Sequence, residues 1–97
     1  MATRQKGMMI FSVGDGLEAI AVLGAVRVEA EADEFWGGPK SRPYRSRVMA
    51  SPTWADLMRC AEEQAAKTLD EQHVFVEGIE FLRKDGRVTV IRLGMGS

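Results

Sequence analysis

Hydrophobic and polar residues alternate in the N-terminal half of the chain in the pattern of β-strands. Residues 8–13 form a short apolar run that ends at a glycine-rich turn. From Ile20 to residue 32 the even positions are small or apolar, and from residue 27 the odd positions are charged. Such period-two alternation is typical of a half-buried strand. We therefore predict strands over both segments, although residues 17–25 also suit a helix because Ala, Leu and Glu favour one.

A third strand is predicted over residues 44–50, after a loop at residues 35–39 that contains two glycines and a proline. Folding the chain back around Gly38 brings opposite charges, and apolar residues, into one antiparallel register. The expected pairs are Glu31 with Arg45, Glu29 with Arg47, and Val28 with Val48. Opposite charges directly across such a pair contribute roughly 0.2–1 kcal/mol each, so this register is favoured.

A helical pattern follows Ser51 and Pro52, which suit the N-cap and the first position of a helix. Apolar residues then recur at helical spacing as far as Leu69. This stripe consists of Trp54, Leu57, Met58, Ala61, Ala65 and Leu69. Cys60 lies off the stripe, nearer to acidic residues of the same helix. Acidic neighbours raise the pKa of a thiol, so we expect Cys60 to be neither a nucleophile nor a redox centre.

The C-terminal part predicts a β-hairpin with strands over residues 74–82 and 88–93. The connection at residues 84–87 contains Asp-Gly, which is a strong hairpin signal. With an odd-numbered loop, one apolar face consists of Phe75, Ile79, Phe81, Ile91 and Leu93, and the other of Val74, Val76, Leu82, Val88 and Val90. One helix covers only one face, so we expect the sheet to fold over itself or a second subunit to cover the spare face.

Together these elements predict an α+β fold in the order β-β-β-α-β-β. It consists of an antiparallel sheet of about five strands with one amphipathic helix, packed as a dimer. A chain of 97 residues is expected to form a single domain over residues 1–97, with residues 1–6 and 94–97 frayed. Its 45% hydrophobic and 28% charged residues are typical of globular rather than disordered proteins.

The net charge and the apolar runs indicate whether the protein binds nucleic acid or a membrane and in which compartment it is expected. The formal net charge of −1 gives no overall attraction to nucleic acid or to an anionic membrane. The apolar runs are too short, or carry too much charge, for a signal peptide or a membrane helix. We therefore expect a cytoplasmic protein that does not contact a membrane.

The sequence predicts no catalytic residue, no metal site and no cofactor. The single histidine excludes a multi-histidine metal site, and the single cysteine has no histidine at a recognisable offset. Residues 14–19 match the pattern G-x-G-x-x-A, but a strand is expected to follow where nucleotide binding requires a helix. A non-enzymatic protein is therefore favoured.

Residues 36–47 contain the densest group of cations together with two aromatic residues. The candidate partner-binding residues are Trp36, Lys40, Arg42, Tyr44, Arg45 and Arg47. Arginine and aromatic side chains together suit single-stranded nucleic acid, and arginine also binds phosphate or carboxylate through two hydrogen bonds. Alternatively, the acidic residues at 29–34 neutralise the four cations in a solvated ribbon, which we favour. Trp36, Lys40 and Arg42 then remain at the tip of the loop, where binding residues concentrate.

The sequence is compatible with three functions of different classes. We favour a small non-enzymatic interaction module, a homodimer that binds a protein partner, because of the spare apolar sheet surface. The second hypothesis is a nucleic-acid-binding module that uses residues 36–47. The third is a small-ligand binder or an enzyme whose pocket forms between helix and sheet or between subunits.

Overall fold

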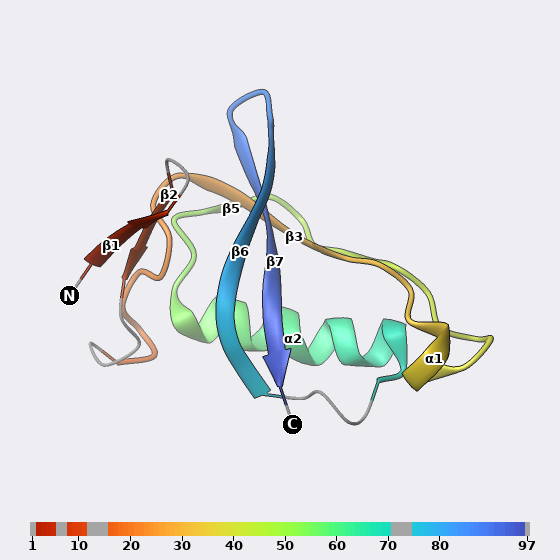
Figure 1. Ribbon diagram of the computed structural model, residues 1–97. Coiled ribbons are helices and arrows are strands. Elements are labelled where there is room, and N and C mark those ends of the chain that lie inside the picture. Colours follow the sequence, from red (N-terminus) through yellow and green to blue (C-terminus); the bar gives the residue numbers. More distant parts are fainter. Residues whose placement is uncertain (1, 6–7, 12–15, 71–74, 97) are drawn as a thin grey trace.

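The computed structural model describes residues 2–5, 8–11, 16–70 and 75–96 and shows a small α+β fold (Figure 1). Its elements are β1 (Ala2–Gln5), β2 (Met8–Phe11), β3 (Ala25–Ala30), α1 (Glu34–Gly37), β4 (Tyr44–Arg45), β5 (Met49–Ala50), α2 (Trp54–Thr68), β6 (Phe75–Asp85) and β7 (Val88–Gly96). The α+β class, a main sheet of five strands and one long helix are confirmed. Strands β1 and β2 form a separate two-stranded sheet.

The main sheet is mixed, so the prediction of a purely antiparallel sheet was wrong. Its strand order is β4-β3-β7-β6, with β5 also paired to β3, and β3 and β7 run parallel. Three consecutive residues of β7, Thr89, Val90 and Ile91, are buried, which is typical of a strand in the interior of a sheet. Because parallel neighbours need a crossover connection, helix α2 supplies the link that lets β7 lie beside β3.

The register between β3 and β4 differs by two residues from the predicted one. Glu29 lies opposite Arg45 and Ala30 opposite Tyr44. A two-residue shift keeps the side chains of β4 on their predicted faces, which is why the alternation alone did not exclude it. The centre of the reversal moves from Gly38 to residue 37, because Asp33 caps the helical turn of α1 and accepts a hydrogen bond from the Trp36 N–H.

Beyond β4 the chain bulges before it pairs with β3 again. The N–H of Ser46 donates to the carbonyl of Val28 at 2.8 Å, and the Val28 N–H donates to Ser46 Oγ at 2.9 Å. The hydroxyl of Ser46 therefore takes the place of a backbone acceptor in the ladder. Strand β5 resumes with Val26 opposite Met49, which leaves Val48 exposed rather than paired with Val28.

Helix α2 begins two residues later than the sequence indicated. Its N-cap is Thr53, whose hydroxyl accepts from the Asp56 N–H at 3.1 Å, while Asp56 Oδ2 accepts from the Thr53 N–H at 2.9 Å. This reciprocal capping box satisfies two N–H groups, whereas Ser51 alone offers one acceptor. Ser51 instead has a φ of 46° and forms hydrogen bonds with Gly24. Gly24, with a φ of 94°, is the last residue of the irregular segment before β3. Residues 17–24 thus form neither a helix nor a regular strand.

The buried face of α2 largely matches the predicted stripe. Trp54, Leu57 and Ala61 are buried as expected, whereas Leu69 is exposed because it adopts a left-handed conformation as the C-cap. Cys60, which was predicted to lie off the stripe, is also buried, with Sγ 3.9 Å from Met49 Sδ. Strand β5 brings Met49 over the flank of the helix, so this position is covered.

The β6–β7 hairpin closes through a two-residue turn, Gly86-Arg87, between the paired residues Asp85 and Val88. The predicted pairing of odd-numbered with odd-numbered residues is nevertheless present beyond residue 82. A bulge at this residue shifts the register by one between Phe81 and Arg83. Ile79, Phe81, Ile91 and Leu93 therefore share the core face. Phe75 and Val74, which were predicted on opposite faces, have side chains outside the described part of the structure.

Side chains of the same chain cover the centre of the second apolar face of the hairpin. Val90 is fully buried, and it lies between Arg27 of β3 and Arg83 of β6 in the sheet register. Arginine stems cover neighbouring apolar surface while their charged ends reach solvent. Val76, also predicted on this face, packs against the core after a second bulge. Burial of Val90 therefore does not require a second subunit.

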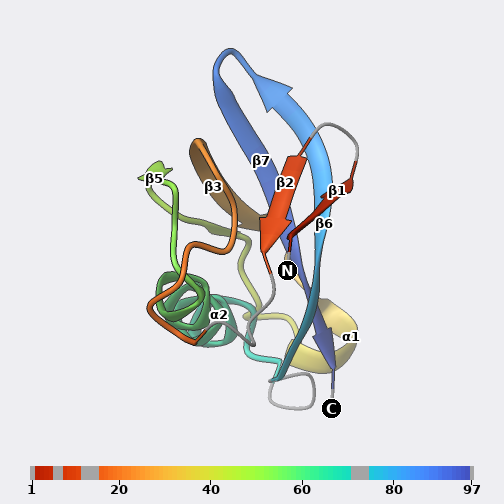
Figure 2. The same cartoon turned by 90° about the vertical axis from the view of Figure 1, so that its left-hand side faces the viewer.

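The hydrophobic core lies between α2 and one face of the main sheet (Figure 2). It includes Val26 and Val28 of β3, Ile91 and Leu93 of β7, and Leu57 of α2. The opposite sheet face is thus left to charged side chains of β3, β4 and β6. Within the described ranges, no helix is long and apolar enough to span a membrane.

Candidate functional site

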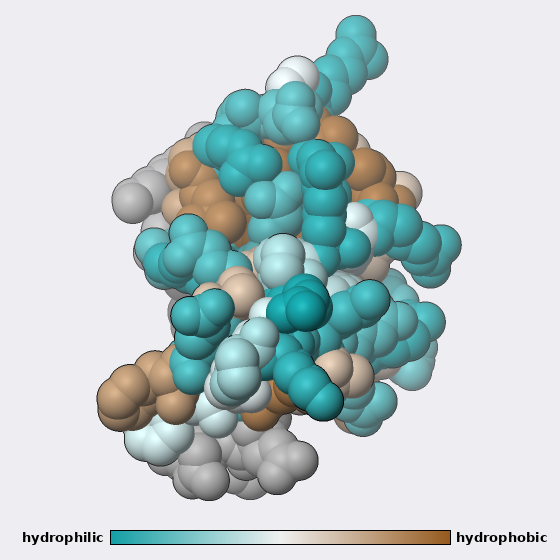
Figure 3. Space-filling view, turned by 90° about the vertical axis from the view of Figure 1, so that its right-hand side faces the viewer, coloured by the Kyte–Doolittle hydropathy of each residue, from teal (hydrophilic) through white to brown (hydrophobic). Residues whose placement is uncertain are grey.

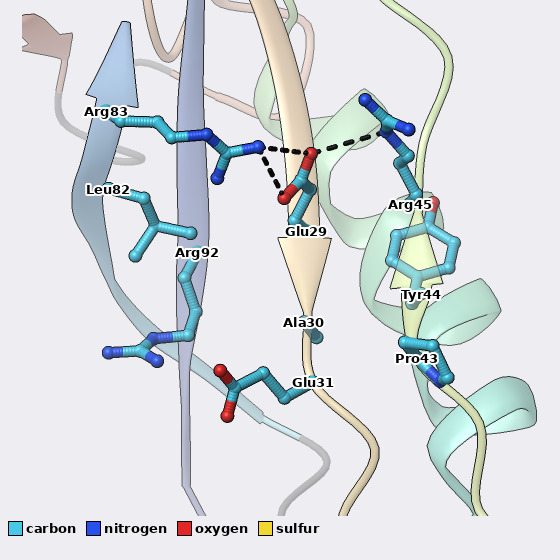
Figure 4. A pocket seen from close by; sticks show the side chains of 9 residues that line it. All are labelled: Glu29, Ala30, Glu31, Pro43, Tyr44, Arg45, Leu82, Arg83 and Arg92. Atoms are coloured by element: carbon cyan, nitrogen blue, oxygen red, sulfur yellow. Dashed lines mark hydrogen bonds and ion pairs between the residues drawn. The ribbon is translucent and has the colours of Figure 1, made fainter.

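A charged cleft lies on the sheet face that points away from α2 (Figure 4). Its volume is about 560 Å³, within the range of small-ligand pockets. The residues that line it are Glu29, Ala30, Glu31, Pro43, Tyr44, Arg45, Leu82, Arg83 and Arg92. They come from β3, β4, β6 and β7 and the residues next to these strands, so the cleft forms only when the sheet is assembled.

The alternation within β3 explains why charge gathers here. Val26 and Val28 face the core, so Arg27 and Glu29 between them face outward. Strand β4 places Arg45 directly opposite Glu29. On the other side of β7, the bulge at residue 82 turns Arg83 toward the same carboxylate (Figure 4).

Glu29 is the centre of an ion-pair network with three arginines. Its Oε2 lies 3.1 Å from Arg27 Nε, 3.3 Å from Arg45 Nε and 3.1 Å from a terminal nitrogen of Arg83, which also donates to Oε1 at 3.0 Å. Burial alone raises the pKa of Glu29, but the hydrogen bonds and charges of Arg83 and Arg27 outweigh this and hold the pKa below its usual value. Glu29 is therefore ionised near neutral pH.

The outer groups of the network connect it to the rest of the sheet. A terminal nitrogen of Arg27 lies 3.0 Å from Asp85 Oδ2, which joins the network to the hairpin end. Arg92 of β7 forms a different ion pair, 2.7 Å from Glu80 Oε2 of β6. The side chain of Glu29 is 20% exposed, whereas those of Arg45 and Arg83 are 64% and 50% exposed. The two arginines therefore present donors to solvent around a largely covered carboxylate.

A second hollow, on the other side of β4, contains Cys60. It has a volume of about 330 Å³ and is lined by Arg45, Ser46, Arg47, Met49, Asp56, Arg59, Cys60 and Glu63. Burial raises the pKa of the Cys60 thiol, which disfavours the reactive thiolate. Tyr44 donates from its hydroxyl to Glu63 Oε1 at 2.6 Å, and burial together with this bond raises the pKa of Tyr44. The hollow therefore lacks an activated nucleophile among the described residues.

An aromatic surface, formed by Phe35 and Trp36 of α1, lies beside the C-terminal end of α2. Phe35 is 85% exposed and Trp36 is 50% exposed, and their rings meet edge to face with centroids 5.0 Å apart. Figure 3 shows the side of the molecule on which α1 lies, where most of the surface is hydrophilic and hydrophobic side chains gather in a few places. The two adjacent exposed aromatic rings are therefore a distinct feature of this side.

The position of α1 is fixed by contacts with α2. Gly37 lies against the backbone of Thr68 so closely that a Cβ at residue 37 would overlap the Thr68 carbonyl oxygen. The N–H of Arg42 donates to the Lys67 carbonyl at 2.8 Å, which ties the following loop to the same helix end. The aromatic surface is thus held on a fixed turn.

The six candidate residues from the sequence are distributed over three neighbouring hollows and the loop after α1. Tyr44 and Arg45 line the charged cleft, and Arg45 and Arg47 line the hollow at Cys60. Trp36 lines a third hollow of about 380 Å³, which shares Ala30, Glu31 and Arg92 with the charged cleft. Lys40 and Arg42 are exposed on the loop after α1, where Arg42 donates to the carbonyls of Pro39 and Ser41. Tyr44 is buried and donates its hydroxyl to Glu63, although its side chain also lines the cleft.

Sequence reasoning missed the residues that the hairpin contributes to the cleft. Leu82, Arg83 and Arg92 are far from β3 along the chain, and no local pattern indicates that they lie beside Glu29. Phe35 was assigned to the loop but not to the binding residues, although its place next to Trp36 was a usable signal. Within the ranges that the structure describes, no cluster of His, Cys, Asp and Glu could hold a metal ion.

The sequence matches no protein-family model, and it matches no curated protein and no solved structure.

Proposed function

We propose that this protein is a small non-enzymatic interaction module that binds a protein partner through the aromatic surface of Phe35 and Trp36. The observation that carries the proposal is the 85% exposure of Phe35 beside the half-exposed Trp36. A partner that covers exposed apolar side chains removes their surface from water. This burial stabilises the complex by about 25 cal/mol per Å² of apolar area. Two aromatic rings on one turn are a suitable anchor, because aromatic residues dominate many interface hot spots.

The rigidity of α1 supports this role. The N-cap of Asp33 and the close contact of Gly37 with Thr68 fix the turn before any partner arrives. A preorganised surface loses less conformational entropy on binding than a flexible loop does. Lys40 and Arg42, exposed on the next loop, supply charged groups of the kind found at the rim of interfaces.

The proposal includes homodimerisation through a second apolar surface. Leu17, Ile20 and Leu23 are all exposed in the irregular segment before β3. This segment lies near the start of α2, since Ile20 pairs with Thr53, whereas the aromatic surface lies at the end of the same helix. Two separate apolar surfaces allow self-association and partner binding at the same time.

Site-specific photo-crosslinking tests partner binding. A photoreactive phenylalanine analogue at residue 35 keeps an aromatic ring there and is expected to give a discrete crosslinked protein in cells. Trp36→Ala should reduce this crosslink about tenfold or more, because truncating an interface hot spot costs about 2 kcal/mol or more. Val48→Ala is the matched control, because it removes an exposed apolar side chain outside both apolar surfaces and is expected to leave the crosslink unchanged. Equal crosslinking in both variants, with the fold verified by circular dichroism, would contradict the proposed surface.

Light scattering over a concentration series tests homodimerisation separately. The expected result is a dimer whose dissociation is promoted by Leu23→Glu, because a charge on an apolar contact must be desolvated. A mass equal to the monomer at every concentration would contradict homodimerisation but not partner binding.

Nucleic-acid binding has less support from the geometry. Arg45 donates to Glu29, Arg47 lines the hollow at Cys60, and Lys40 and Arg42 lie on the loop after α1. A salt series with labelled oligonucleotides provides the check, since binding through phosphates weakens steeply as salt rises. Salt-dependent binding that Arg42→Gln, Arg45→Gln and Arg47→Gln together abolish would favour this alternative over a protein partner.

A further inference from the structure

We infer that the charged cleft binds a small organic anion whose carboxylate bridges Arg45 and Arg83, with Glu29 as an internal competitor. The cleft shares Ala30, Glu31 and Arg92 with the hollow that Trp36 lines, but Arg45 and Arg83 line only the cleft of these two. The inference does not depend on the proposed function. Four observations support it: the guanidinium groups that share one carboxylate, their shared contact atom, the apolar wall of the cleft and the position of Glu31.

The first observation is that several guanidinium groups share one carboxylate. Arg27, Arg45 and Arg83 converge on Glu29, and Arg27 also pairs with Asp85. The side chains of Arg45 and Arg83 remain 64% and 50% exposed beside this shared partner. A second carboxylate would be bound where these two side chains are exposed.

The second observation is that Arg45 and Arg83 contact the same oxygen atom. Glu29 Oε2 lies 3.3 Å from Arg45 Nε and 3.1 Å from Arg83. Two guanidinium groups that share one oxygen are close enough to share a second carboxylate. Each guanidinium has five N–H donors in a plane, and Arg45 and Arg83 contact Glu29 through only one nitrogen each. The other donors are therefore available to a ligand in the part of the cleft that the structure describes.

The third observation is an apolar wall beside these donors. Pro43 and the ring of Tyr44 lie on one side of the cleft, and Leu82 lies on the other (Figure 4). Small-molecule sites combine such apolar walls with a few polar groups that fix orientation. The volume of about 560 Å³ accommodates an organic molecule rather than only an inorganic ion.

The fourth observation limits the charge of the ligand. Glu31 lines the opposite end of the cleft, near Arg92, whose guanidinium already pairs with Glu80 (Figure 4). A second negative charge on the ligand would approach the carboxylate of Glu31 and be repelled. A monoanionic carboxylate therefore suits the cleft better than a dianionic phosphate does.

Nuclear magnetic resonance titration with sodium benzoate tests the site directly. Benzoate joins a carboxylate to an apolar ring, and benzamide is its neutral counterpart. At constant ionic strength, benzoate is expected to shift the side-chain Nε–H signals of Arg45 and Arg83 saturably, whereas benzamide is not. Loss of one charged hydrogen-bond partner corresponds to about a tenfold or greater weakening, so Arg83→Gln should raise the Kd at least tenfold.

Matched variants separate binding from a structural effect. Arg87→Gln removes an exposed arginine in the hairpin turn, outside the cleft, and is expected to leave the benzoate Kd within about twofold, because surface charges away from a site act weakly through solvent. Glu29→Gln removes the internal competitor and is expected to tighten benzoate binding, a result that a purely structural role of Glu29 would not produce.

Three results would overturn the inference. One is the absence of a saturable benzoate shift in the folded protein, and another is equal weakening by Arg83→Gln and Arg87→Gln. The third is tighter binding of inorganic phosphate than of benzoate, because the ligand would then not be a monoanionic carboxylate. None of these results bears on crosslinking at residue 35, so failure of this inference is distinguishable from failure of the proposed function.

Discussion

Glu29 on β3 accepts two hydrogen bonds from Arg83 on β6, across the intervening strand β7 and across 54 residues of sequence. The contact spans three neighbouring strands, and it joins the hairpin to the part of the sheet formed before α2. Arg27 extends it to Asp85 beside the hairpin turn. The network therefore holds together two parts of the sheet that the chain forms separately.

Glu29 makes stability depend on acid pH. Its pKa in the folded protein lies below the ordinary value of 4.5, so its contribution is fully present above that value and is lost as pH falls through the folded-state pKa. We expect the free energy of unfolding to fall with decreasing pH below about 4.5. Glu29→Gln should reduce the free energy at neutral pH by about 1 kcal/mol, because the partners are half exposed.

Urea denaturation at several pH values measures this effect. The wild-type protein and Glu29→Gln are expected to differ most near neutral pH and to converge in acid. Glu31→Gln is the control, since the pKa of Glu29 is held down by Arg83 and Arg27 rather than by residue 31. Parallel pH profiles for wild type and Glu29→Gln would show that the network does not stabilise the fold.

The start of α2 offers a local test of the capping box. Thr53→Ala removes the hydroxyl that accepts from the Asp56 N–H, and it should lower the free energy of unfolding by about 1 kcal/mol. Thr53→Asn should lose much less, because Asn is also a good N-cap residue. Chemical denaturation of the two variants gives the comparison, and equal losses would mean that the cap contributes little.

The same helix shows what the sequence could predict. The stripe of Trp54, Leu57 and Ala61 follows from helical spacing, which depends on neighbours within one turn or two. The helix start was misplaced because Ser51 and Thr53 are both good N-cap residues, and only the partner three positions later decides between them. Asp56 provides that partner for Thr53.

The order and direction of the strands could not be predicted in this way. Alternation shows which residues of β3 face outward, but a shift of two residues leaves this pattern unchanged, so Arg45 was paired with Glu31 instead of Glu29. The position of β7 beside β3 depends on contacts between distant segments. The charged cleft could not be predicted for the same reason, because Arg83 lies beside Glu29 only when β7 and β6 follow β3 in the sheet.

Tyr44 is the only tyrosine in the sequence, so its ionisation can be followed without interference. Burial and the hydrogen bond to Glu63 raise its pKa above the ordinary value of 10.0. Its contribution to stability is fully present below that value and is lost as pH rises toward the folded-state pKa. We expect the tyrosinate absorbance of the folded protein to stay low above pH 10.0 and to rise only on unfolding.

Removing the Tyr44 hydroxyl should also weaken the fold. Tyr44→Phe loses a 2.6 Å hydrogen bond to the Glu63 carboxylate, which corresponds to about 1 kcal/mol in the free energy of unfolding. Glu63→Gln retains an acceptor oxygen and should have a smaller effect. A tyrosinate signal at the pH of a free tyrosine, in protein that is still folded, would show that this hydroxyl is not held as described.

Gly37 connects the fold to the proposed partner surface. A Cβ at this position would overlap the carbonyl oxygen of Thr68, so Gly37→Ala must move α1 away from the end of α2. Overpacking of this kind costs roughly 1–3 kcal/mol of stability. Because Phe35 and Trp36 move with the turn, we also expect crosslinking from residue 35 to fall several-fold. Gly78→Ala is the matched control, since no atom lies within 4 Å of the Cβ it would add, and it should leave crosslinking unchanged. If Gly37→Ala unfolds at the same denaturant concentration as wild type, and crosslinks equally, the turn does not need its contact with Thr68 to present the aromatic surface.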